Sequence, residues 1–286
     1  MKVTPTESQL GAVVTEIDLA APLDGAALSS LKAAIAEHKV LSFPDQPLTL
    51  EQLEDFTRQV GEFGADPFIE PMPGHPNVLE LRREPDETVS NFGAGWHSDW
   101  SFQDTPPSYT ILHGDVIPPS GGDTLFCDCQ AAWDDLPEDV QEMLLQLKGV
   151  HSAILPYSLQ GVYAQDAEQR SMKFRLSAEA EEMRSHPLVR VHPISGRRSI
   201  YASQVYTIGI EDMEFDEASE ILNTLHEHLT QPHYIYRHKW AKDTLLMWDN
   251  RAVNHFAEGG YDGHLRVMHR TTVKGEVPVA ADPLES

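Results

Sequence analysis

The chain has 286 residues, of which 41% are hydrophobic, and its 45 acidic and 21 basic side chains give a formal net charge of −24. This charge argues against nucleic acid or an anionic membrane as a partner. No apolar run approaches the roughly 20 residues of a membrane span, and the length suits one elaborated barrel or sandwich domain, which we expect to cover residues 1–286.

The first residues, MKVTPTESQL, carry no apolar signal core. Cys127 and Cys129 are separated by one residue, a spacing that is poor for a disulfide, so both are expected to be reduced thiols. These features predict a soluble, cytoplasmic protein.

Short apolar runs alternate with amphipathic segments in the first third of the chain. Thr49 and Gln52 have the spacing of a capping box, which predicts that a helix begins there. The predicted elements are strands within 1–20 and at 40–44 and 78–82, helices at 24–38 and 50–60, and a Pro- and Gly-rich loop at 65–78.

The rest of the chain is richer in strands. Residues 155–185 are polar, weakly patterned and basic at Arg170, Lys173 and Arg175, which is typical of an inserted lid. Strands are predicted at 108–114, 123–127, 150–154, 188–192, 199–202, 233–240, 244–248 and 265–273, and helices at 131–147 and 216–230. Many short strands, with late ones that must pair with early ones, predict a mainly β, jelly-roll-like sandwich with flanking helices.

The motif His97-Ser98-Asp99 contains two possible metal ligands. Side chains two residues apart share a face when the backbone is extended, so the imidazole and the carboxylate can bind one ion. His255 is the best third ligand, and two His with one carboxylate form the open-sided site of non-haem Fe(II) oxygenases. The motif alone is weak, because the chain has 14 His.

Arg266 and Arg270 lie on the last predicted strand, four residues apart and therefore on one face. Two guanidiniums that face an interior need anionic partners. Salt bridges to Asp or Glu would satisfy them, and so would the capture of a carboxylate or sulfonate of a bound molecule.

An ordered set of motifs resembles the taurine dioxygenase and 2,4-dichlorophenoxyacetate dioxygenase family. It covers the chain from Gly11 to Gly275. The motifs are Trp96-His97-Ser98-Asp99, Thr105-Pro106-Pro107, Gly121-Gly122-Asp123-Thr124, Trp248-Asp249-Asn250-Arg251 with His255, and Arg266 to Gly275. The resemblance implies a double-stranded β-helix (a jelly-roll, cupin-like fold) and a dioxygenase that uses Fe(II), 2-oxoglutarate and O2.

The same resemblance implies residue roles and a reaction. It assigns the iron to His97, Asp99 and His255, and 2-oxoglutarate to Thr124, Arg266, Arg270 and Trp248. Arg270 is also expected to face the acidic group of the substrate. The implied reaction hydroxylates a small anionic organic substrate, such as a sulfonate or an aryloxyalkanoate, and gives succinate and CO2.

Departures from the family pattern bear on the substrate. Residues 64–70 lack the histidine that contacts the sulfonate in taurine enzymes, so taurine itself is not the expected substrate. Phe92, Trp100 and Tyr206 are interpreted as contacts to a larger or more aromatic substrate. Ordinary core packing would explain the same three aromatics.

Two other functions remain open from the residues. A zinc-dependent hydrolase can also use His-x-Asp and a distant His, and dependence of activity on Zn(II) in place of Fe(II) would distinguish it. A non-catalytic metal-binding sensor of the same fold would not need the two arginines. The family also implies a homo-oligomer, dimeric or tetrameric.

Overall fold

A seven-stranded sheet forms the larger layer of the computed structural model, which describes residues 1–283 except residue 9. The expected domain, residues 1–286, therefore includes four residues outside the described part. The strand order is β1 (Lys2–Pro5), β2 (Ala12–Thr15), β3 (Val40–Phe43), β13 (Leu245–Asp249), β5 (Tyr109–Val116), β15 (Arg266–Val273) and β4 (Leu79–Arg83). Strands from both ends of the chain thus alternate in one sheet.

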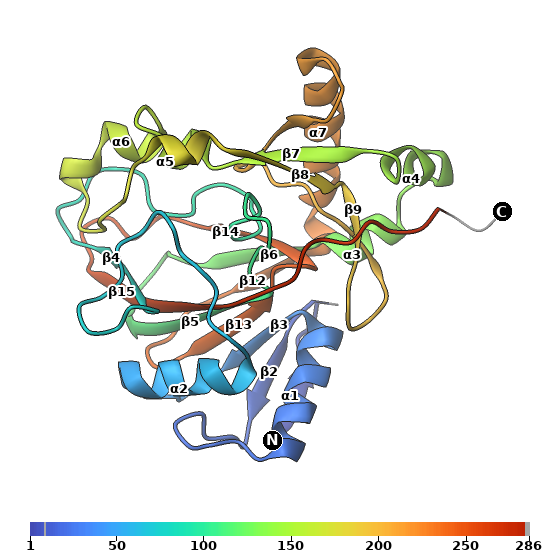
Figure 1. Cartoon of the computed structure of the whole chain (residues 1–286). Helices are drawn as coiled ribbons and strands as arrows, with labels where there is room; N and C mark the ends of the chain where they lie inside the picture. Colours follow the sequence, from blue (N-terminus) through green and yellow to red (C-terminus); the bar gives the residue numbers. More distant parts are fainter. Residues whose placement is uncertain (9, 284–286) are drawn as a thin grey trace.

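A three-stranded sheet faces the middle of the large sheet (Figure 1). It contains β12 (Ile235–His238), β6 (Thr124–Asp128) and β14 (Val253–Ala257) in that order. Phe126 of this sheet packs with Trp248 and Met268 of the large sheet in a buried apolar cluster. The two facing sheets confirm the predicted jelly roll.

Two helices cover the outer face of the large sheet, α1 (Gly25–His38) and α2 (Leu50–Val60) (Figure 1). Asp24 caps α1 by accepting a hydrogen bond from the Ala27 amide. Thr49 and Gln52 form the predicted capping box at the start of α2. Local sequence therefore defines both helix starts.

Further strands and helices form a second layer beyond the small sheet. They are β7 (Lys148–Ser152), β8 (Met183–Pro187), β9 (Val189–Val191), β10 (Arg198–Ile200), β11 (Thr207–Ile210), α3 (Cys129–Asp134), α4 (Glu138–Leu144), α7 (Phe215–Leu229) and the 3-10 turn η3 (Pro232–Tyr234). Trp133 of α3 and Leu225 of α7 share a buried cluster with Val189 and Ile200.

The predicted secondary structure needs correction in two respects. The helix predicted at 131–147 is two helices, because Pro137 lies between α3 and α4 and lacks the amide that would continue the first. Strands β8, β11 and β14 were not predicted. Cys127 and Cys129 are both free, as expected, and both are buried.

Residues 155–185 contain ordered short helices and end in β8. These are α5 (Ile154–Tyr157), α6 (Val162–Gln165), and the 3-10 turns η1 (Ala167–Gln169) and η2 (Ala178–Glu181). Arg170 is not part of an exposed basic patch: it is 5% exposed, and its Nε and Nη2 donate to the two carboxylate oxygens of Asp166 at 2.5 and 2.7 Å. None of the helices within the described residues is long and apolar enough to cross a membrane.

Candidate active site

His97 and His255 are joined by their backbones. The His97 amide donates to the His255 carbonyl at 3.0 Å, and the His255 amide donates to the His97 carbonyl at 2.7 Å. His255 lies on β14, so this bridge fixes the 97–99 segment to the small sheet. The predicted extended strand ends at once, because Asp99 and Trp100 lie in a turn, with φ of +46° at Trp100.

Asp99 is fully buried, and its carboxylate accepts hydrogen bonds on both oxygens. Thr110 on β5 donates its hydroxyl to Oδ2 at 2.6 Å, and Arg270 on β15 donates to Oδ1 at 3.2 Å. Burial alone would raise the pKa of Asp99, but Arg270, His255 and His97 lower it to about 2. The carboxylate is therefore ionised at neutral pH.

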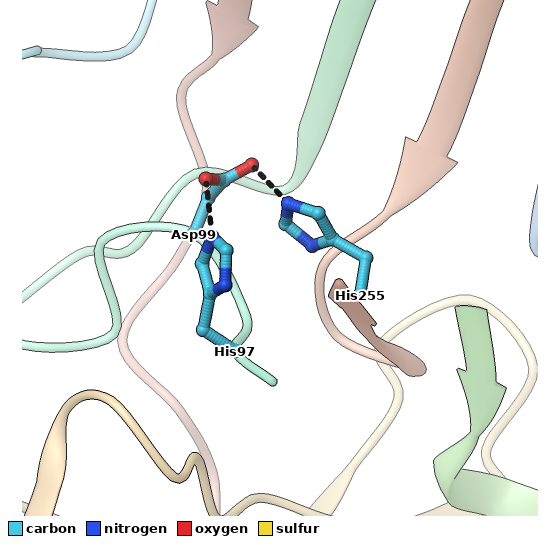
Figure 2. Close-up of side chains that lie close together, drawn as sticks. All are labelled: His97, Asp99 and His255. Atoms are coloured by element: carbon cyan, nitrogen blue, oxygen red, sulfur yellow. Dashed lines mark ion pairs between the residues drawn. The ribbon is translucent and has the colours of Figure 1, made fainter. Parts of the chain in front are cut away.

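The three side chains converge on one point, as Figure 2 shows. Their ligand atoms lie within 4.8 Å of one another; Asp99 is 3.7 Å from Nε2 of His97 and 3.9 Å from Nε2 of His255. These separations are too long for hydrogen bonds. They suit ligands that each lie about 2.1 Å from one shared divalent ion.

The protonation state of both imidazoles also suits a metal. His97 Nδ1 lies 2.7 Å from the carbonyl of Gly95, so Nδ1 carries the proton and Nε2 has a free lone pair. Burial lowers the pKa of His97, and burial together with His97 lowers the pKa of His255 to about 3. Two neutral imidazoles and one carboxylate are the donors that a divalent iron site needs.

Asn250 is a supporting residue that the sequence analysis did not single out. Its Nδ2 donates to the Thr110 hydroxyl at 2.9 Å, which directs the Thr110 proton to Asp99. Its Oδ1 accepts from the indole of Trp248 at 3.0 Å and from the Asp99 amide at 3.3 Å. The sequence signal that could have identified Asn250 is its position in the Trp248-Asp249-Asn250-Arg251 motif, directly after β13.

Arg266 lies in the cavity beside the triad, and that cavity is also lined by Thr124 and Trp248. Arg266 is 8% exposed. Its guanidinium donates to the Gly122 carbonyl at 3.3 Å and has a buried Nε without a partner among the described residues. Burial lowers its pKa. Thr124 Oγ1 accepts from Trp240 at 3.0 Å, which leaves its proton free to donate. A buried cation beside a free hydroxyl fits the distal carboxylate of 2-oxoglutarate.

Arg270 shares the cavity but already has two carboxylate partners. One is Asp99, and the other is Asp66, at 3.0 Å, in the loop before β4. Trp100 is completely buried beneath Arg270, with the guanidinium carbon 4.6 Å from its ring centre. Sequence reasoning noted that the 64–70 loop lacks a histidine and missed that Asp66 contacts Arg270.

The other two aromatic candidates line cavities at the site. Phe92 lines the cavity that contains Arg266 and a second cavity beside it, which also includes Tyr206. The Tyr206 ring meets the His97 ring edge-on at 5.7 Å. Tyr163 from α6 joins this second cavity, so part of the 155–185 segment forms its wall.

Comparison with known proteins gives consistent matches. The model of the family described as "Taurine catabolism dioxygenase TauD, TfdA family" matches residues 2–272. An alpha-ketoglutarate-dependent sulfate ester dioxygenase of Pseudomonas putida is 32% identical over 99% of this chain and 92% of its own length. A 2,4-dichlorophenoxyacetate dioxygenase of Cupriavidus pinatubonensis is 34% identical over 88% and 90%. The crystal structure of a taurine dioxygenase from Burkholderia xenovorans superimposes with a TM-score of 0.82 at 30% identity, covering 99% of this chain and 94% of that one.

Proposed function

The chain belongs to the taurine catabolism dioxygenase TauD, TfdA family, and on that premise we propose how its site performs the reaction and on what class of substrate. The enzyme is an oxidoreductase that uses Fe(II), 2-oxoglutarate and O2. Its proposed substrate is a small anionic organic molecule, the class that the names of the sulfate ester and 2,4-dichlorophenoxyacetate relatives describe. The reaction hydroxylates that molecule and gives succinate and CO2.

His97, Asp99 and His255 would hold the iron. The observation that carries this assignment is the convergence of two neutral imidazoles and one ionised carboxylate on a single buried point. Bound Fe(II) would supply the activation of O2, with 2-oxoglutarate as the reducing co-substrate. Thr110 and Arg270 keep the Asp99 carboxylate charged and oriented, and the His97–Gly95 hydrogen bond keeps Nε2 available.

Arg266 and Thr124 would bind the far carboxylate of 2-oxoglutarate, and Trp248 would form the wall of its site. The support is the buried guanidinium without a carboxylate partner among the described residues, next to a hydroxyl that can donate. A dianion with one carboxylate at Arg266 extends across the cavity toward the triad, because His97, His255 and Arg266 line the same cavity.

Residues 155–185 would act as the lid of this single domain and keep water from the reacting groups. Phe92 and Tyr206 would contact the apolar part of the substrate, since both line the cavities beside His97. Trp100 would act indirectly on the substrate site, because its ring stacks against the guanidinium of Arg270.

The test is succinate formation from 2-oxoglutarate with Fe(II), ascorbate and O2, across sulfonates, sulfate esters and aryloxyalkanoates. We expect succinate that rises with one of these classes, and none in Asp99→Ala. Full activity of Asp99→Ala would contradict the metal assignment. Activity that requires Zn(II), or iron-loaded protein that forms no succinate, would favour a hydrolase or a sensor.

A further inference from the structure

Asp66 already occupies the arginine that would otherwise receive an acidic substrate. Its carboxylate accepts from Arg270 at 3.0 Å, from the indole nitrogen of Trp100, and from the Thr272 hydroxyl at 3.4 Å. Arg270 and Trp100 are buried, and the Asp66 side chain is only 10% exposed. Three donors thus fix one carboxylate against a buried cation, and a competing anion must replace all three contacts.

Both terminal nitrogens of the Arg270 guanidinium already donate to carboxylates. One terminal nitrogen donates to Asp66 and the other to Asp99, while Trp100 stacks on the guanidinium plane at 4.6 Å. Its buried Nε has no partner among the described residues. An anion that makes a bidentate contact with Arg270 must share at least one terminal nitrogen with Asp66 or Asp99, so it competes with these carboxylates for the guanidinium.

The charge balance of the buried site also disfavours a substrate anion next to Arg270. The two buried arginines, Arg266 and Arg270, and the two carboxylates, Asp66 and Asp99, sum to zero. The charges of a divalent metal ion and of the dianion 2-oxoglutarate also sum to zero. Without Asp66 the loaded site would carry one positive charge, which a monoanionic substrate would neutralise. With Asp66 the same substrate would leave an uncompensated negative charge in a buried site, which is costly.

We propose that Asp66 is a specificity-determining residue: it acts as a built-in counter-ion of Arg270, so that the part of the substrate next to Arg270 is uncharged. The acid of an acidic substrate then lies at the end of the molecule away from Arg270. This inference rests on the proposed function, because the charge balance includes the metal ion and 2-oxoglutarate. It narrows that function by excluding substrates that place a sulfonate or carboxylate on Arg270.

The test measures whether a small anion gains access to Arg270 when Asp66 loses its charge. The protein is loaded with Mn(II) and 2-oxoglutarate, and its melting temperature is recorded against methanesulfonate and against the uncharged methanesulfonamide at constant ionic strength. We expect methanesulfonate to raise the melting temperature of Asp66→Asn by about 2–4 °C and to leave the wild type unchanged. Methanesulfonamide should not distinguish the two proteins.

Three further variants make the result specific to Asp66 and Arg270. Asp55→Asn removes an exposed carboxylate that pairs with Arg58 on α2, and it should respond as the wild type does. Adding Arg270→Met to Asp66→Asn should abolish the response. Asp66→Ala is a second variant, with the same expectation as Asp66→Asn, should the asparagine protein fold poorly.

Two kinds of outcome would contradict the proposed role of Asp66. If methanesulfonate stabilises the wild type as much as Asp66→Asn, or stabilises neither folded Asp66 variant, Asp66 does not control access to Arg270. Mn(II) binding is measured first, and its absence from the wild type would overturn the proposed function and this inference together. Metal binding and succinate formation without the Asp66 effect would overturn this inference alone.

Discussion

Arg266 illustrates at the scale of one residue how a binding site can oppose stability. The guanidinium is buried, and no carboxylate among the described residues lies within ion-pair distance of it. A buried charge without an opposite charge destabilises the fold, whereas a bound carboxylate would satisfy it. The same side chain therefore lowers the stability of the ligand-free protein and stabilises the complex with 2-oxoglutarate.

Arg266→Met should raise the KM for 2-oxoglutarate by about 10- to 150-fold, because a charge-assisted hydrogen bond contributes about 1.5–3 kcal/mol. It should also raise the free energy of unfolding of the ligand-free protein by about 1–3 kcal/mol. Steady-state kinetics and urea denaturation measure the two effects. Arg82→Met is the matched control, since Arg82 lines the same cavity but pairs with Glu84 at 2.6 Å; a control with the same KM increase would contradict the role of Arg266.

Asn250 supports the triad without contacting the cavity. Asn250→Ala removes the donor that orients the Thr110 hydroxyl toward Asp99, so we expect metal affinity to fall about 10- to 100-fold. Titration with Mn(II) measures the affinity. Asn91→Ala is the control, because Asn91 donates to the Ala257 carbonyl of β14 and does not contact Asp99. Unchanged metal affinity in Asn250→Ala would refute this supporting role.

At the scale of elements, the sequence predicted what local chemistry determines. Helix α2 begins where the capping box of Thr49 and Gln52 predicts. The long helix at 131–147 was predicted because its apolar spacing is continuous, but Pro137 interrupts the backbone hydrogen bonds. Strand β14 lacks a clear alternating pattern, so only its His255 was identified.

The candidate site was predictable where residues belong to a recognisable motif, and not where a contact involves a residue outside any motif. The structure brings His97, Asp99 and His255 together, as their residue types indicated. Asp66 and Arg270 are 204 positions apart, and their ion pair depends on how the 64–70 loop crosses the end of β15. No local pattern encodes such a contact.

The 155–185 segment depends on a few buried polar contacts. Arg170 pairs with Asp166, donates to the Ser90 carbonyl at 2.8 Å, and stacks on Tyr163. Backbone hydrogen bonds from Arg175 to Phe68 and from Glu70 to Lys173 join the segment to the loop before β4. The segment is thereby tied to the loop before β4 and to the loop that contains Ser90, a residue that lines the cavity.

Arg170→Gln should loosen this segment, since removing one partner of a buried ion pair leaves the other uncompensated, at a cost of about 3–5 kcal/mol. We expect faster hydrogen exchange confined to residues 155–175, and more succinate formed per molecule of hydroxylated product. Arg184→Gln is the control, because Arg184 makes surface pairs with Asp104 and Glu182 near the end of the segment, outside residues 155–175. Unchanged exchange in Arg170→Gln would show that the segment does not depend on this pair.

At the scale of the whole molecule, two effects of pH on stability oppose each other. The net charge of −24 destabilises the compact state through self-repulsion, and acidification relieves that repulsion. Burial lowers the pKa of His238 to about 4 and, with a smaller contribution from His186, the pKa of His151 to about 3, against an ordinary value of 6.5. The unfolded chain therefore binds protons below about pH 6.5 that the folded chain does not bind, and this destabilises the fold as the pH falls.

Salt separates the two effects, because it screens repulsion between exposed charges and leaves buried groups little affected. In 0.5 M NaCl, a concentration of roughly the order that shortens screening to a few ångströms, we expect the free energy of unfolding to decrease steadily from pH 6.5 to 5. Each buried histidine contributes at most about 1.4 kcal/mol per pH unit. His238→Asn removes one such group, which lies on β12 away from the triad. The free energy of unfolding of this variant should therefore fall less steeply with pH than that of the wild type, by up to about 1.4 kcal/mol per pH unit. Urea denaturation across the pH series measures the slopes. Equal slopes for the wild type and His238→Asn would show that the folded and unfolded chains protonate His238 alike, so that burial does not lower its pKa.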